Sequence, residues 1–148
     1  MSPLPAPPPH HLVVAKPAVG AETASIYRAY DEWPGESRHS VDPVVEALRA
    51  GNLHELAKEL GNDLAPVTRG FVPEVQKLEE ELLHARALGV AMSGTGTAVY
   101  GLFGSMAEAQ VAERSLRAPF AEVCEPVPHG VVMLEGKKRG PVTGKAGC

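Results

Sequence analysis

The stretch of this chain whose residue types point to ligand chemistry is a run of five small residues: Ser93, Gly94, Thr95, Gly96 and Thr97. Two glycines one residue apart let the backbone adopt positive φ and let another group approach closely. The flanking hydroxyls and unpaired backbone N–H groups could bind an anion. A hairpin turn with a purely structural role has the same composition. Neither common nucleotide-binding motif is present, because no Gly-Lys-Ser/Thr follows and Val99 stands where GxGxxG requires glycine.

The segments on either side of this run must position it. Residues 88–92 and 98–103 are apolar and bounded by turn residues, which predicts two buried strands joined as a hairpin. Residues 73–87 have apolar side chains at helical spacing, which predicts a helix that Gly89 would end. After the hairpin, Ser105 and Glu108 form a capping box, which predicts a helix over 106–117.

The first half of the chain predicts one strand and several short helices. Residues 12–15 are β-branched and favour a strand, and Thr23 is a suitable N-cap for a helix over 24–31. A polar loop then leads to helices capped by Asp42 and Asn52, and a further short piece begins at residues 62–64. With strands over 120–127 and 131–135, the order indicates an α+β fold with helices on one face of a small antiparallel sheet.

Composition limits the classes of protein to consider. The chain has 148 residues, which suits one domain, and its net charge of −4 argues against a general nucleic-acid binder. No apolar run approaches the roughly 20 residues that cross a bilayer, so we expect no membrane partner. The six His and two Cys do not fall into zinc-ligand spacing, and the cysteines predict no disulfide framework. We therefore expect a cytoplasmic protein without a metal site.

Three regions differ in composition. Residues 1–10 are Pro-rich and are expected to form an extended linker. Residues 11–135 are expected to form the domain, and residues 136–148 a disordered basic tail.

Four blocks, in order, resemble the 4-diphosphocytidyl-2-C-methyl-D-erythritol kinase family of the GHMP kinase superfamily. They are LVVAKPAVGAETASIYRAYDE (12–32), GNDLAPVTRGFVPEVQKLEEELLHARALG (61–89), AMSGTGTAVYGLF (91–103) and PHGV (128–131). The likeness covers about residues 3–135 and concerns the C-terminal domain of the family, a ferredoxin-like α+β sandwich. It implies an ATP-dependent kinase of non-mevalonate isoprenoid (terpenoid) biosynthesis. Such an enzyme phosphorylates the 2-hydroxyl of the methylerythritol unit in a cytidine-diphosphate-linked substrate.

The resemblance also implies roles for individual residues. Tyr27 takes the position of the aromatic residue that stacks on cytosine, although an isolated Tyr is more often a core residue. Thr23 matches a threonine near the same site or serves as the helix cap. The residues from Ser93 to Thr97 would lie against the ATP phosphate loop of the other lobe and near the substrate phosphates. Asn62 and Asp63 are expected to have a structural cap or turn role rather than a catalytic one. Glu22 departs from the family pattern.

The motifs of the family's N-terminal lobe are absent from this sequence. There is no Pro-x-x-x-Gly-Leu-Gly-Gly-Gly-Ser phosphate loop, no Lys-x-Asn-Leu segment and no Asp that accepts the proton. We therefore expect no catalytic residue here, with ATP and Mg²⁺ bound mainly by an N-terminal lobe that acts as partner. We also expect a truncated or split reading frame whose product is inactive alone.

Two alternatives remain open. One is a stand-alone, non-catalytic ferredoxin-like module that binds a nucleotide or a protein. The other is a different GHMP kinase, such as a homoserine, mevalonate or galactose kinase. Tyr27 and the KPAVG-x-x-T block (16–23) argue against this second alternative.

Overall fold

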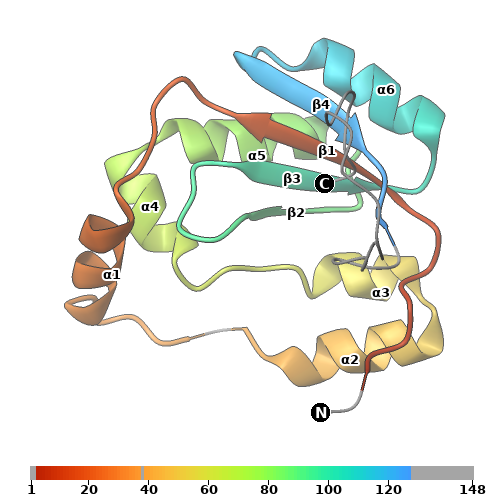
Figure 1. Ribbon diagram of the computed structural model, residues 1–148, viewed down its shortest axis with the longest axis horizontal. Coiled ribbons are helices and arrows are strands. Elements are labelled where there is room, and N and C mark those ends of the chain that lie inside the picture. Colours follow the sequence, from red (N-terminus) through yellow and green to blue (C-terminus); the bar gives the residue numbers. More distant parts are fainter. Residues whose placement is uncertain (1–2, 38, 128–148) are drawn as a thin grey trace, which may run out of the picture.

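The protein folds around a four-stranded antiparallel sheet with strand order β2-β3-β1-β4 (Figure 1). The computed structural model describes residues 3–37 and 39–127. The strands are β1 (His11–Lys16), β2 (Gly89–Met92), β3 (Val99–Phe103) and β4 (Phe120–Cys124). The helices are α1 (Thr23–Asp31), α2 (Val41–Ala50), α3 (Leu53–Lys58), α4 (Ala65–Phe71), α5 (Glu74–His84) and α6 (Met106–Ser115). The predicted α+β fold with a small antiparallel sheet is confirmed.

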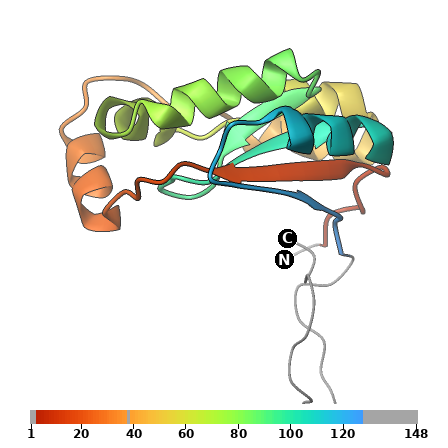
Figure 2. The same ribbon diagram turned by 90° about the horizontal axis from the view of Figure 1, so that it is seen from above.

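One face of the sheet carries the core. Figure 2 shows α5 (green) and α6 (teal) on the same side of the sheet. Side chains alternate along β1 and β3, so that every second residue faces these helices. The fully buried residues of this layer are Val13, Ala15, Val99 and Phe103 from the strands, with Val75, Leu82, Ala109 and Ala112 from the helices. Burial of each large apolar side chain contributes about 1.5–3 kcal/mol to the free energy of unfolding.

The β2 edge of the sheet is closed by α3, which packs in turn against α2. A Cβ placed on Gly89 would lie only 2.2 Å from the carbonyl oxygen of Ala57 in α3. Helix α5 ends at His84, Arg86 adopts a φ of +72° in the connection, and Gly89 is the first residue of β2. The prediction that Gly89 ends the preceding helix is therefore wrong. Glycine is needed there because the backbone of α3 leaves no room for a side chain.

Several helix caps agree with the sequence, and two do not. Asn52 accepts a hydrogen bond from the N–H of Glu55, and Ser105 accepts one from Glu108, as predicted. Helix α2 is capped by Ser40 rather than by Asp42. Helix α1 begins at Thr23 with Glu22 in the N-cap position, and no side chain caps it. The prediction of Thr23 as the cap is thus wrong, because its hydroxyl is directed toward another segment.

Helices α4 and α5 are joined by a pair of opposite charges. The guanidinium of Arg69 donates two hydrogen bonds to the carboxylate of Glu79, with N···O distances of 2.8 and 3.0 Å. The Glu79 side chain is 8 % exposed and that of Arg69 is 37 % exposed. Bidentate geometry of this kind fixes orientation as well as distance. The pair therefore sets how α4 is held against α5.

The outer strand β4 has its own contact with a helix. The N–H of Val123 donates to the carboxylate Oε2 of Glu113 in α6 at 2.6 Å. The predicted strand over 120–127 is shorter than expected and ends at Cys124. The strand expected over 131–135, the PHGV block and the tail over 136–148 lie outside the described residues.

Candidate functional site

The turn between β2 and β3, formed by residues 93–97, is exposed at its tip. Ser93 and Gly94 are both exposed. The turn is closed internally by the N–H of Ser93, which donates to Ala98 O at 2.9 Å, and by the N–H of Gly96, which donates to Ser93 O at 3.0 Å. Both glycines have positive φ, +57° at Gly94 and +94° at Gly96. The sequence prediction of a tight glycine-dependent turn between two strands is confirmed.

Backbone N–H groups of this turn are free to bind a ligand. Within residues 3–37 and 39–127, the amides of Gly94, Thr95 and Thr97 donate to no protein atom, and those of Gly94 and Thr95 are adjacent. Adjacent free N–H groups in a turn form a site for an anion such as a phosphate. The geometry is therefore compatible with the anion cradle considered from the sequence.

Helix α4 and the residues before it hold the turn from its inner side. The side-chain amide of Asn62 donates to Met92 O at 2.8 Å and to Gly94 O at 2.7 Å. The hydroxyl of Thr68 donates to Thr95 O at 2.9 Å. Asn62 was predicted to have a structural role, whereas the sequence analysis did not single out Thr68. The available signal was a hydroxyl on the buried side of a short helix.

The loop before α1 and the start of α1 reach the turn from the other side. The hydroxyl of Thr97, which is 4 % exposed, donates to Val19 O at 3.0 Å. The hydroxyls of Thr23 and Thr95 are 3.2 Å apart and share a hydrogen bond. Residues far apart in the sequence therefore meet at the turn, and Figure 1 shows α1 and α4 at this end of the sheet.

Tyr27 lies on α1 four residues after Thr23. Residues four apart occupy the same side of a helix, one turn from each other. The Tyr27 side of α1 is open, since this residue is 51 % exposed, whereas its neighbour Ile26 is 1 % exposed and anchors the helix. Tyr27 is therefore not a core residue, and its ring is accessible on the helix that contacts the turn.

Asp63 lies apart from the turn although it follows Asn62. Its carboxylate accepts a hydrogen bond from the hydroxyl of Ser37, and its Oδ1 is 3.9 Å from His39 Nε2. Asp63 and His39 border a hollow of about 230 Å³ that Trp33 also lines. Glu22 is exposed, and its carboxylate accepts a hydrogen bond from the hydroxyl of Ser25 on its own helix. The structure thus brings Asn62 to the turn and Asp63 to the loop before α2.

A second, mainly apolar hollow adjoins the turn on the sheet. It has a volume of about 310 Å³ and is lined by Leu12, Val14, Ser93, Ala98, Val99 and Tyr100. The phenol of Tyr100 is half-buried here, and this burial raises the pKa of the Tyr100 hydroxyl above 10.0. The sequence analysis assigned Tyr100 to a strand and gave it no role. A group seated in this hollow would lie beside Ser93.

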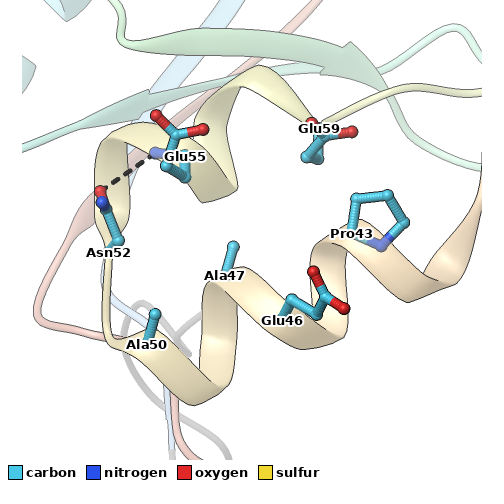
Figure 3. A pocket seen from close by; sticks show the side chains of 7 residues that line it. All are labelled: Pro43, Glu46, Ala47, Ala50, Asn52, Glu55 and Glu59. Carbon is cyan, nitrogen blue, oxygen red and sulfur yellow. Dashed lines mark hydrogen bonds between the residues drawn. The ribbon is translucent and has the colours of Figure 1, made fainter.

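A third hollow, between α2 and α3, has acidic walls. Figure 3 shows Glu46, Glu55 and Glu59 around an opening of about 270 Å³. Glu55 pairs with Lys58 at 2.7 Å, which also raises the pKa of the Lys58 ammonium through that hydrogen bond. In the described part of the chain, no group of three or more His, Cys, Asp or Glu side chains is arranged to hold a metal ion. No helix among the described residues is long and apolar enough to span a membrane.

Comparison with known proteins gives one family. The profile of the family "GHMP kinases C terminal" matches residues 44–122. A 4-diphosphocytidyl-2-C-methyl-D-erythritol kinase from Thermoanaerobacter pseudethanolicus is 36 % identical over 113 residues, which are 76 % of this chain and 39 % of that protein. One from Pelotomaculum thermopropionicum is 39 % identical over 111 residues, or 74 % and 39 % of the two chains. This chain thus spans about two-fifths of the length of the curated relatives it matches.

Solved structures agree with the fold. A crystal structure of a 4-(cytidine 5'-diphospho)-2C-methyl-D-erythritol kinase superposes with a TM-score of 0.66 at 28 % identity, over 82 % of this chain and 44 % of that one. Mevalonate kinase from L. major, in complex with R-mevalonate, gives a TM-score of 0.67 at 22 % identity, over 84 % and 45 %. The second likeness shows the fold alone.

Proposed function

We propose that this chain, which belongs to the GHMP kinase family and matches the C-terminal domain of its members, is the substrate-binding lobe of a 4-diphosphocytidyl-2-C-methyl-D-erythritol kinase. The reaction would transfer the γ-phosphoryl group of ATP to the 2-hydroxyl of the substrate, in non-mevalonate isoprenoid biosynthesis. The relatives at 36 % and 39 % identity carry this name, which supports the choice of substrate within the family.

The observation that carries the proposal is the contact between α1 and the turn. Thr23 touches Thr95 through their hydroxyls, and Tyr27 lies one helical turn beyond Thr23. A cytidine diphosphate has a flat base at one end and two phosphates at the other. Tyr27 would stack on the base, which contributes about 1–3 kcal/mol to binding. The free N–H groups of Gly94 and Thr95 would hydrogen-bond to phosphate oxygens.

The remaining roles follow from the same arrangement. Thr23 would contact the substrate near the turn, and the residues from Ser93 to Thr97 would support the phosphate loop of an N-terminal lobe. Asn62 would serve as a structural residue of the turn, and Asp63 as one of the adjoining loop. The exposed turn fits a phosphate, and the described residues contain no cluster of three or more His, Cys, Asp or Glu side chains arranged to hold a metal ion such as Mg²⁺. ATP supplies the phosphoryl group when bound, and we assign ATP and Mg²⁺ mainly to the N-terminal lobe.

Phosphoryl transfer depends on positioning and on neutralising developing charge. We propose that this chain contributes positioning only, by binding the nucleotide end of the substrate and presenting its hydroxyl to the other lobe. The catalytic groups would then come from the N-terminal lobe, and the chain alone would be inactive. A separately produced N-terminal lobe from a relative should restore ATP turnover when mixed with this chain.

The direct test is titration of the chain with CDP by isothermal calorimetry. We expect saturable binding that Tyr27→Ala weakens about tenfold or more, the loss of one stacking contact. Tyr27→Phe keeps the ring and should bind as the wild type does. Equal CDP affinities for the wild type and Tyr27→Ala would show that Tyr27 does not bind the base. They would also contradict the proposed substrate. Binding of CDP without turnover in the mixed sample would favour the non-catalytic nucleotide-binding module.

A further inference from the structure

Thr68 is a buried hydroxyl whose partner lies outside its own helix. It is 0 % exposed, and its Oγ1–H donates to Thr95 O at 2.9 Å. A threonine inside a helix commonly bonds back to a carbonyl of the preceding turn of that helix. Here the hydroxyl is instead directed to the glycine-rich turn. The methyl group of Thr68 lies against the same turn, since a Cβ on Gly96 would be 2.8 Å from Thr68 Cγ2.

Asn62 is fixed by hydrogen bonds on both sides of its amide. Its Nδ2 donates to Met92 O and Gly94 O, and its Oδ1 accepts from the N–H of Leu64 at 2.9 Å. The two carbonyl acceptors require the nitrogen on this side. The side chain therefore has one orientation, set by the residues that lead into α4.

These contacts decide where the free N–H groups of the turn point. In a trans peptide the C=O and the following N–H lie on opposite sides of the same plane. Asn62 draws the carbonyl of Gly94 inward, which turns the N–H of Thr95 outward. Thr68 likewise draws the carbonyl of Thr95 inward, so that the next N–H, that of Gly96, faces Ser93 O. Asn62 thus sets the direction of the Thr95 N–H directly. Thr68 acts one step further away: the Gly96 N–H holds the carbonyl of Ser93, and the peptide of that carbonyl carries the free N–H of Gly94.

We propose that Thr68 and Asn62 are positioning residues that set the affinity of the turn for the diphosphate group of the nucleotide. The inference rests on the proposed function and deepens it, because α4 also packs against α1, which carries Tyr27. Helix α4 thereby fixes the spacing between Tyr27, which would stack on the base, and the turn that would bind the phosphates. Loss of the contacts from Thr68 and Asn62 to the turn lowers the affinity for a ligand that carries phosphates. It leaves the affinity for the base alone unchanged.

The experiment compares CDP with cytidine on the wild type and on Thr68→Val and Thr68→Ser. Thr68→Val keeps the shape and removes the donor, whereas Thr68→Ser keeps the donor. We expect Thr68→Val to weaken CDP binding about tenfold, the loss of one buried hydrogen bond at the turn. Cytidine binding should stay unchanged, and Thr68→Ser should retain the wild-type affinity for CDP. The ¹⁵N-amide signals of Gly94 and Thr95 should shift with CDP in the wild type and shift much less in Thr68→Val.

The controls separate positioning from general destabilisation. Ser115→Ala removes a hydroxyl that also donates to a backbone carbonyl, Ala112 O, in the distant helix α6. It should leave both affinities unchanged. If Thr68→Val does not fold, Asn62→Leu removes the other donors without adding charge and should give the same split between CDP and cytidine.

Equal loss of CDP and cytidine binding, or no loss of either, overturns the positioning roles. Inorganic pyrophosphate distinguishes this failure from failure of the proposed function. If CDP binding does not depend on Tyr27 but pyrophosphate shifts the amides of Gly94 and Thr95, the proposed substrate is wrong. The positioning roles of Thr68 and Asn62 are then supported if Thr68→Val weakens pyrophosphate binding, and overturned if it does not. Wild-type amides that respond to neither CDP nor pyrophosphate overturn both proposals.

Discussion

The hydroxyls of Thr23 and Thr95 lie 3.2 Å apart and join the first turn of α1 to the glycine-rich turn between β2 and β3. These residues are separated by 72 positions in the sequence. Through this contact, the exposed ring of Tyr27 and the free N–H groups of Gly94 and Thr95 belong to one region of the surface. The contact itself is exposed, so that its contribution to stability is small.

Replacement of Thr23 should affect ligand binding more than folding. Thr23→Val removes the hydroxyl shared with Thr95 and should weaken CDP binding about threefold to tenfold, with little change in the thermal midpoint. Thr23→Ser keeps the hydroxyl and is the matched control. Calorimetric titration and differential scanning calorimetry measure the two effects. Full CDP affinity in Thr23→Val would show that this hydroxyl takes no part in the site.

The two glycines of the turn should differ in their tolerance of a side chain. Gly94→Ala places a methyl group in open space at a φ of +57° and should cost about 1 kcal/mol of stability. Gly96→Ala has a φ of +94° and also brings Cβ within 2.8 Å of Thr68 Cγ2 and 3.0 Å of Met92 Sδ. We expect it to cost about 3 kcal/mol. Urea denaturation checks the order, which equal midpoints for the two variants would contradict.

Loss of the Arg69–Glu79 pair should be costly because Glu79 is buried. Arg69→Met leaves the carboxylate without its partner and should lower the free energy of unfolding by about 2 kcal/mol, less than for a fully buried pair. The control is Lys58→Met, which breaks the exposed pair with Glu55 and should leave the free energy of unfolding nearly unchanged. Both values come from chemical denaturation. Similar small effects would show that Glu79 gains water when Arg69 is removed.

Ionisation of Tyr100 should lower the stability of the fold at alkaline pH. Burial raises the pKa of the Tyr100 hydroxyl in the folded state, so that the fold binds this proton more tightly than the unfolded chain does. The resulting stability is present below pH 10 and is lost as the pH rises through the folded-state pKa. As the pH rises above 10.0, Tyr100→Phe should lose less stability than the wild type. Thermal midpoints measured across this range test the difference, and parallel curves would contradict it.

The elements of the fold were largely predictable because local signals and the final packing agree. Asn52 and Ser105 cap the helices that they were predicted to cap. The glycine-rich turn joins the two expected strands as a hairpin. The errors have a common cause. Gly89 and Thr23 carry strong local signals for a helix end and a helix start, but each is used by a contact with a segment distant in the sequence. Such contacts override local preference and cannot be derived from one sequence window.

The candidate site was predictable in its parts and not in its assembly. The turn and Tyr27 stand out by residue type and by resemblance to the kinase family. Thr68 gave little signal, because a threonine in a short helix is unremarkable until its hydroxyl has a known partner. That partner, the carbonyl of Thr95, lies 27 residues further on. Side-chain to backbone contacts over such a distance depend on the packing of α4 beneath the turn.

The bond between Glu113 and the N–H of Val123 has a consequence for how molecules of this protein meet each other. A strand at the border of a sheet exposes donors that another polypeptide can use to extend the sheet. In β4 one such donor is already occupied by a carboxylate from α6. A foreign strand would have to displace this side chain and approach its negative charge. The sheet is thereby guarded against growth by edge-to-edge aggregation on its β4 side.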